Sequence, residues 1–122
     1  FRLDTVKHVP LDYWKSFTND VLAQKPTSYL VGEYFLVDVP KNISESDIQK
    51  YYKIENQTGM SVFDFQLRHA MIKVFVEGEG FSTIMNVLSK DDRYLSATEM
   101  GTFIDNHDFP RFLTLNPDLK AF

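Results

Sequence analysis

The chain has 122 residues, of which 43% are hydrophobic and 25% charged, the composition of an ordinary globular domain. Its net charge of −4 gives no reason to expect nucleic acid or an anionic membrane as a partner, and no apolar run is long enough to span a bilayer. The chain contains no cysteine, which excludes disulfides, thiolate metal sites and cysteine nucleophiles.

Short apolar runs that end in a carboxylate alternate with stretches of helical periodicity along the whole chain. The elements predicted in chain order are a strand at 1–4, a helix at 11–22, a strand at 29–33, a short helix at 48–54 preceded by Ser44 and Asp47, a strand at 60–65, helices at 67–75 and 81–88, and a strand at 102–105. The last run leads into the polar segment 106–108.

The alternation of strands and helices predicts βαβ units and a parallel sheet. Asp4, Glu33 and Asp64 end successive apolar runs and lie about 30 residues apart, which is the length of one βαβ step. In such sheets the chemistry takes place at the carboxyl ends of the strands, where these carboxylates fall. The pattern is compatible with a closed barrel and with an open, doubly wound sheet.

Three segments at the predicted strands are the most specific: FRLDTVKH at residues 1–8, VGEYF at 31–35 and FIDNHD at 103–108. They resemble the motifs at the fourth, fifth and seventh barrel strands of the α-amylase family of retaining glycoside hydrolases. Further likeness, in GMS at 59–61 and DF at 64–65, is to the cyclodextrin glucanotransferases and their near relatives within the family.

The resemblance implies an α/β fold, a partial (β/α)8 TIM barrel that contains approximately strands 4 to 7. A complete barrel takes about 250 residues, so we interpret residues 1–122 as a fragment of a single catalytic barrel domain. The remainder of the barrel is then a necessary partner. We expect the 122 residues to be inactive when isolated, because the other strands are needed to complete the site.

The resemblance also implies roles for three carboxylates. Asp4 corresponds to the nucleophile that forms a glycosyl-enzyme intermediate. Glu33 corresponds to the general acid, and then to the base that activates water or an acceptor sugar. Asp108 corresponds to the residue that binds sugar hydroxyls and helps to distort the ring towards the transition state.

Five further residues are expected at the substrate. Arg2 lies two residues before Asp4, on the same strand face, and is expected to keep that carboxylate ionised and oriented. By the resemblance, Lys7 and His8 line the acceptor side, Phe35 presents a ring there, and His107 donates hydrogen bonds to the sugar. The His8 backbone carbonyl corresponds to one calcium ligand, with the others outside this chain. Calcium is therefore expected in the full-length protein and not in this chain alone.

The function expected from the resemblance is hydrolysis of α-1,4-glucosidic bonds in starch-like polysaccharides by a retaining mechanism, with an α-glucan as the substrate. Transglycosylation is the first alternative, and a non-catalytic carbohydrate-binding barrel is the second. The resemblance also implies a secreted, extracellular protein. Outside the site, we interpret Asp64, Asp105 and Asn106 as structural residues, and the glutamate- and glycine-rich stretch 77–80 as a loop.

Overall fold

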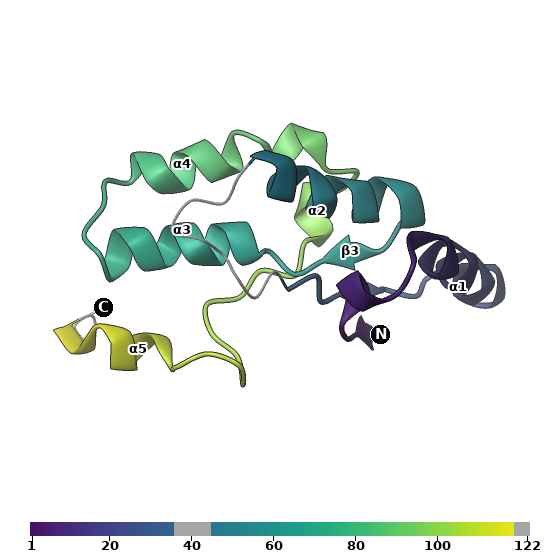
Figure 1. The fold of residues 1–122 in the computed structure, drawn as a ribbon, viewed down its shortest axis with the longest axis horizontal. Helices are drawn as coiled ribbons and strands as arrows, with labels where there is room; N and C mark the ends of the chain where they lie inside the picture. Colours follow the sequence, from purple (N-terminus) through teal and green to yellow (C-terminus); the bar gives the residue numbers. More distant parts are fainter. Residues whose placement is uncertain (36–44, 119–122) are drawn as a thin grey trace. The chain divides into compact units, whose positions relative to one another are not determined.

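The structure, a computed structural model, describes residues 1–35 and 45–118. These residues, drawn as a ribbon in Figure 1, form two compact units. The first unit comprises Phe1–Phe63 and Asp92–Gly101, and the second comprises Asp64–Asp91 and Thr102–Phe122. No helix within the described ranges has both the length and the apolar sequence that a membrane crossing requires.

The first unit contains a parallel three-stranded sheet in the order β1-β2-β3, with β1 at Arg2–Leu3, β2 at Val31–Gly32 and β3 at Ser61–Val62. Leu3 pairs with Gly32, and Gly32 pairs with Val62, so the ends of the three strands are aligned in register. Three of the four predicted strands are thereby confirmed at the centres of their apolar runs. Consecutive strands that are parallel and adjacent fit part of a (β/α)8 barrel.

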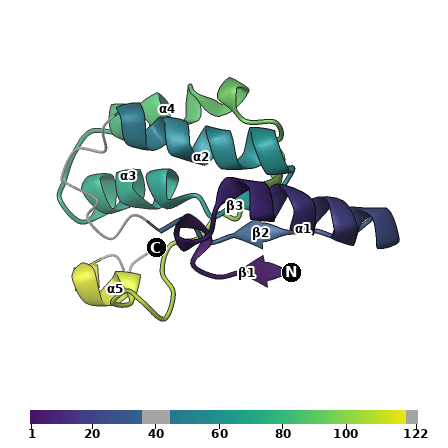
Figure 2. The same ribbon diagram turned by 45° about the vertical axis from the view of Figure 1, so that its right-hand side comes forward.

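Two helices connect these strands and lie beside the sheet (Figure 2). Helix α1 (Leu11–Gln24) confirms the helix predicted at 11–22 and extends it by two residues. Helix α2 (Glu45–Thr58) is much longer than the predicted 48–54, so Asp47 lies within the helix rather than before it. The buried Thr18 hydroxyl of α1 donates to the Thr58 carbonyl at the end of α2, 2.8 Å away, which ties the two helices together.

The second unit contains helices α3 (Phe65–Phe75), α4 (Ser82–Leu88) and α5 (Phe112–Leu115), and the first two run alongside each other in both views (Figures 1 and 2). The structural role predicted for Asp64 is confirmed, because its carboxylate caps α3 by accepting the Leu67 N–H at 2.8 Å. Burial raises the pKa of Asp64. The loop predicted at 77–80 is also confirmed.

The strand predicted at 102–105 does not form in the structure. The chain makes one parallel bridge instead, between Phe63 and Gly101, just before the predicted run. Two short 3₁₀ turns, η2 (Asp91–Arg93) and η3 (Ala97–Glu99), precede this bridge in the chain. Beyond it, the Asp105 carboxylate accepts the Phe112 N–H at 2.9 Å, which closes the chain into a loop rather than extending it.

Candidate active site

Asp4 and Glu33 directly follow two neighbouring parallel strands, β1 and β2. Because Leu3 and Gly32 are paired in register, the residues that follow them emerge at the same edge of the sheet. The backbone reinforces this arrangement: the Glu33 N–H donates to the Leu3 carbonyl at 2.7 Å, and the Val6 N–H donates to the Glu33 carbonyl at 3.1 Å. The sheet therefore brings these two predicted carboxylates to one place.

Glycine at position 32 is required by close packing at this edge. A Cβ atom at Gly32 would lie 2.4 Å from the Met60 sulfur and 2.9 Å from a Val6 methyl carbon. Met60 and Val6 are both completely or almost completely buried, at 0% and 1% exposure. The residue before Glu33 is thus pressed against the core, which fixes the backbone that carries the carboxylate.

The segment after Asp4 turns sharply into a short 3₁₀ helix, η1 (Val6–His8). Thr5 makes the turn with a φ of 50°, a left-handed conformation that is uncommon for a threonine. The turn buries Val6, leaves Lys7 half-buried and exposes His8. The backbone strain therefore lies directly beside Asp4, in the position where such strain is often found at functional sites.

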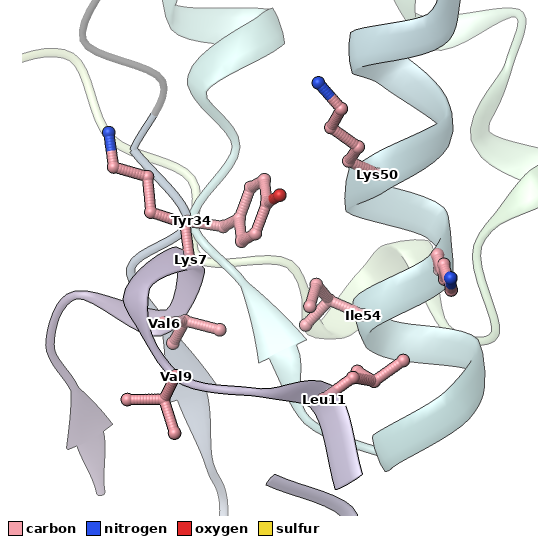
Figure 3. A pocket seen from close by; sticks show the side chains of 8 residues that line it. Val6, Lys7, Val9, Leu11, Tyr34, Lys50 and Ile54 are labelled. Carbon is pink, nitrogen blue, oxygen red and sulfur yellow. The ribbon is translucent and has the colours of Figure 1, made fainter. Parts of the chain in front are cut away.

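A pocket of about 250 Å³ opens beside this turn, in the first unit (Figure 3). Lys7 and Tyr34 line this pocket, and Tyr34 is the residue that follows Glu33. Figure 3 shows the Tyr34 ring directed toward the helix that carries Lys50. Its full lining is Val6, Lys7, Val9, Leu11, Tyr34, Lys50, Lys53 and Ile54. Lys7 was predicted at the substrate, but Lys50 and Lys53 were not, although Lys50 lies one helical turn before Lys53 and Ile54 on α2.

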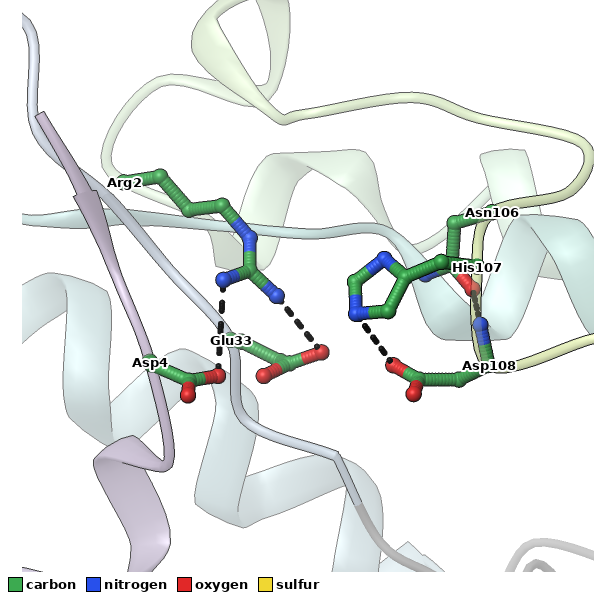
Figure 4. A network of polar contacts seen from close by, with 6 residues as sticks. All are labelled: Arg2, Asp4, Glu33, Asn106, His107 and Asp108. Atoms are coloured by element: carbon green, nitrogen blue, oxygen red, sulfur yellow. Dashed lines mark hydrogen bonds and ion pairs between the residues drawn. The ribbon is translucent and has the colours of Figure 1, made fainter.

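Arg2 forms ion pairs with both of the predicted catalytic carboxylates in the first unit, Asp4 and Glu33 (Figure 4). One guanidinium nitrogen lies 3.4 Å from Asp4 Oδ1 and the other lies 3.1 Å from Glu33 Oε1. The sequence predicted the first contact and missed the second, which depends on strand register. The two carboxylates differ in environment, because the Asp4 side chain is 64% exposed and the Glu33 side chain only 8%.

His107 and Asp108 belong to the second unit. Their side chains contact each other, with His107 Nε2 3.4 Å from Asp108 Oδ2, and the Asn106 side chain accepts the Asp108 N–H at 2.9 Å (Figure 4). The structural interpretation of Asn106 is thereby confirmed. The convergence of Asp108 with Asp4 and Glu33 stays a prediction.

Asp105 is confirmed as a structural residue of the same segment. It forms an ion pair with Arg111 at 2.6 Å and accepts the Phe112 N–H. The Phe112 hydrogen bond and, after it, Arg111 lower the pKa of Asp105. Both oxygens of this carboxylate therefore hold the loop, one through Arg111 and the other through the Phe112 N–H.

The side chains of residues 1–35 and 49–118 include no group of three or more histidines and carboxylates that could hold a metal ion. Calcium takes six to eight oxygen ligands, which include backbone carbonyls as well as carboxylates. The calcium contact of the His8 carbonyl, and the binding of calcium only in the full-length protein, stay predictions. Phe35, also predicted at the substrate, is half-buried directly after Tyr34.

No protein-family model matches the chain. It is 33% identical to a cyclomaltodextrin glucanotransferase of Thermoanaerobacterium thermosulfurigenes over 91% of this chain and 15% of that protein. It is 32% identical to an α-amylase of Niallia circulans, over 91% of this chain and 20% of that protein. Among solved structures it resembles CldA, a cyclomaltodextrin glucanotransferase with a three-domain ABC distribution, with a TM-score of 0.87 and 38% identity over 97% of this chain and 23% of CldA. The chain thus spans less than a quarter of the length of each of these relatives.

Proposed function

Because the chain belongs to the α-amylase family, we propose that it is part of the catalytic barrel of a retaining enzyme that cleaves α-1,4-glucosidic bonds in starch-like polysaccharides. In this proposal the chain supplies approximately strands 4 to 7 of a longer, secreted protein. The observation that carries it is the pairing of β1 with β2, which sets Asp4 and Glu33 at adjacent strand ends, both in contact with Arg2.

The proposed mechanism assigns the two carboxylates complementary roles. Retaining glycosidases hold two carboxyl groups about 5–5.5 Å apart, one as the nucleophile and one as the acid and base. Asp4 attacks the anomeric carbon while Glu33 gives a proton to the departing glycosidic oxygen. Glu33 then takes a proton from water, which displaces Asp4 with net retention.

The other predicted residues support these steps. Arg2 fixes the relative positions of the two carboxylates by contacting both. Asp108 and His107 bind the hydroxyls of the sugar ring that reacts, so that the ring is held in its distorted form. Lys7, which lines the pocket together with Tyr34, contacts the sugar on the acceptor side. His8 follows Lys7 in η1 and lines the same side of the site.

The stereochemistry of the products tests this proposal. We expect the full-length enzyme to release sugars from soluble starch as the α-anomer, because two displacements at one carbon restore its configuration. Proton NMR at early times, before mutarotation, distinguishes the two anomers. Initial release of the β-anomer would refute the retaining mechanism, and binding of starch without any turnover would favour a non-catalytic barrel.

Transglycosylation is the second candidate, because cyclomaltodextrin glucanotransferases are among the relatives. A sugar competes with water for the glycosyl-enzyme only if the site binds and orients it with a high effective molarity. An aromatic face at Phe35, two residues after Glu33, can stack on the acceptor sugar, a contact that water does not use.

Replacement of Phe35 by serine is therefore expected to impair transfer more than hydrolysis. Loss of part of one ring contact corresponds to about 1–2 kcal/mol of acceptor binding, or about a tenfold fall in the ratio of transfer to hydrolysis. The ratio is measured at several acceptor concentrations, with Phe81→Ser, a 65% exposed phenylalanine of the second unit, as the control. An equal, small ratio in the wild type and the Phe35 variant would make Phe35 structural and the protein a plain amylase.

A further inference from the structure

Arg68 of α3 is stacked on aromatic rings in the second unit. Its guanidinium carbon lies 3.6 Å from the centre of the Phe109 ring and 6.0 Å from the centre of the Phe103 ring. Its Nε atom is buried and has no hydrogen-bond partner among the described residues. The contact with the Phe109 ring has the geometry of a cation–π stack.

A second side chain on the same face of α3, that of Phe65, also contacts the rings of Phe103 and Phe109. Phe65 lies three residues before Arg68, which places the two side chains on one side of the helix. The Phe65 ring meets the Phe103 ring edge-on at 5.0 Å, and it meets the Phe109 ring at 6.4 Å. Helix α3 therefore holds Phe103 and Phe109 through one apolar and one cationic side chain.

These two rings flank the segment 104–108, which carries Asp108. Within the segment, Asn106 binds the Asp108 N–H, and Asp105 is tied to Arg111 and the Phe112 N–H. Phe109 follows Asp108 directly, so the stack on Arg68 fixes the chain immediately after that carboxylate. The backbone of Asp108 is thus held on one side by a side-chain hydrogen bond and on the other by a ring contact.

We propose that Arg68 is a positioning residue, which holds Asp108 in its working orientation through the ring of Phe109. This inference rests on the role proposed above for Asp108 at the reacting sugar. A planar guanidinium can lie flat on a ring face, whereas the compact ammonium of lysine cannot match that contact area. Burial lowers the pKa of Arg68, and the nearby Asp105 carboxylate acts in the opposite direction and attracts the charge.

The test begins with Arg68→Met in the full-length enzyme, which keeps the apolar stem and removes the guanidinium. We expect kcat and kcat/KM on soluble starch to fall together by about tenfold or more, because a misplaced Asp108 loses an interaction made in the transition state. Arg93→Met is the matched control, since Arg93 lies 5.7 Å from the Tyr52 ring in the first unit. We expect that variant to stay within about twofold of the wild type.

A double-mutant cycle with Asp108→Asn separates positioning from a general loss of stability. If Arg68 acts through Asp108, Arg68→Met causes little further loss of kcat in the Asp108→Asn background. Arg68→Lys retains the charge and the stem, so we expect an intermediate loss of kcat and the same non-additivity with Asp108→Asn. This variant replaces Arg68→Met in the cycle if Arg68→Met does not fold. Independent, fully additive losses, or an unchanged kcat in both Arg68 variants, would overturn the inference alone. Wild-type activity of Asp108→Asn would overturn the role proposed for Asp108, and the inference with it.

Discussion

Replacement of Asp4 by asparagine in the full-length enzyme is expected to lower kcat by about 10⁴-fold or more. In the proposed mechanism Asp4 forms the bond to the anomeric carbon, and a neutral amide is a poor nucleophile. Asparagine has nearly the same shape as aspartate, so it leaves the packing unchanged and removes the charge that lies 3.4 Å from Arg2. The loss is therefore expected in the chemical step, which is measured as kcat on soluble starch.

Asp12→Asn is the matched control, because Asp12 is 94% exposed at the start of α1 and pairs only at the surface with Lys15. We expect its kcat to equal that of the wild type. A slow-reacting fluorinated glycosyl donor provides a direct second measurement, since the trapped intermediate labels the peptide that contains Asp4. A label on Glu33 or Asp108, or an active Asp4→Asn variant, would contradict the assignment.

The sheet could be predicted from the sequence because each strand is a short apolar run that ends in a polar residue. Asp4 and Glu33 end the first two of these runs, at a spacing that matches a strand, a helix and the next strand. Parallel pairing then follows from the alternation with helices, and it sets Asp4 beside Glu33. The prediction of this part of the candidate site therefore requires only local sequence patterns and one topological rule.

Contacts that depend on register or on packing could not be predicted in the same way. The sequence placed Arg2 on the face of Asp4, but its contact with Glu33 requires the register of the paired strands. The helix α2 was predicted too short because its polar residues obscure the helical pattern. The strand predicted at 102–105 was wrong because the Asp105 carboxylate captures the Phe112 N–H, a contact seven residues along the chain.

Gly32→Ala is the change with the largest expected effect on stability. The new methyl carbon would lie 2.4 Å from the Met60 sulfur and 2.9 Å from a Val6 methyl carbon, and real Cβ atoms do not approach so closely. Met60 is flexible, but it is 0% exposed, so it can move only by displacing other close-packed core atoms. We expect a loss of about 1–3 kcal/mol in the free energy of unfolding, measured by denaturation of the full-length enzyme.

The same change is expected to lower kcat by up to about 10²-fold, because Gly32 carries Glu33 and relief of the clash must shift that backbone. Gly80→Ala is the matched control, since its Cβ would approach nothing closer than the Ser82 hydroxyl at 3.5 Å. If the clash with Met60 is the cause, Met60→Val, which has no atom at the sulfur position, should restore part of the loss when combined with Gly32→Ala. Equal kcat and stability in the Gly32 and Gly80 variants would show that the contact between β2 and Met60 does not position Glu33.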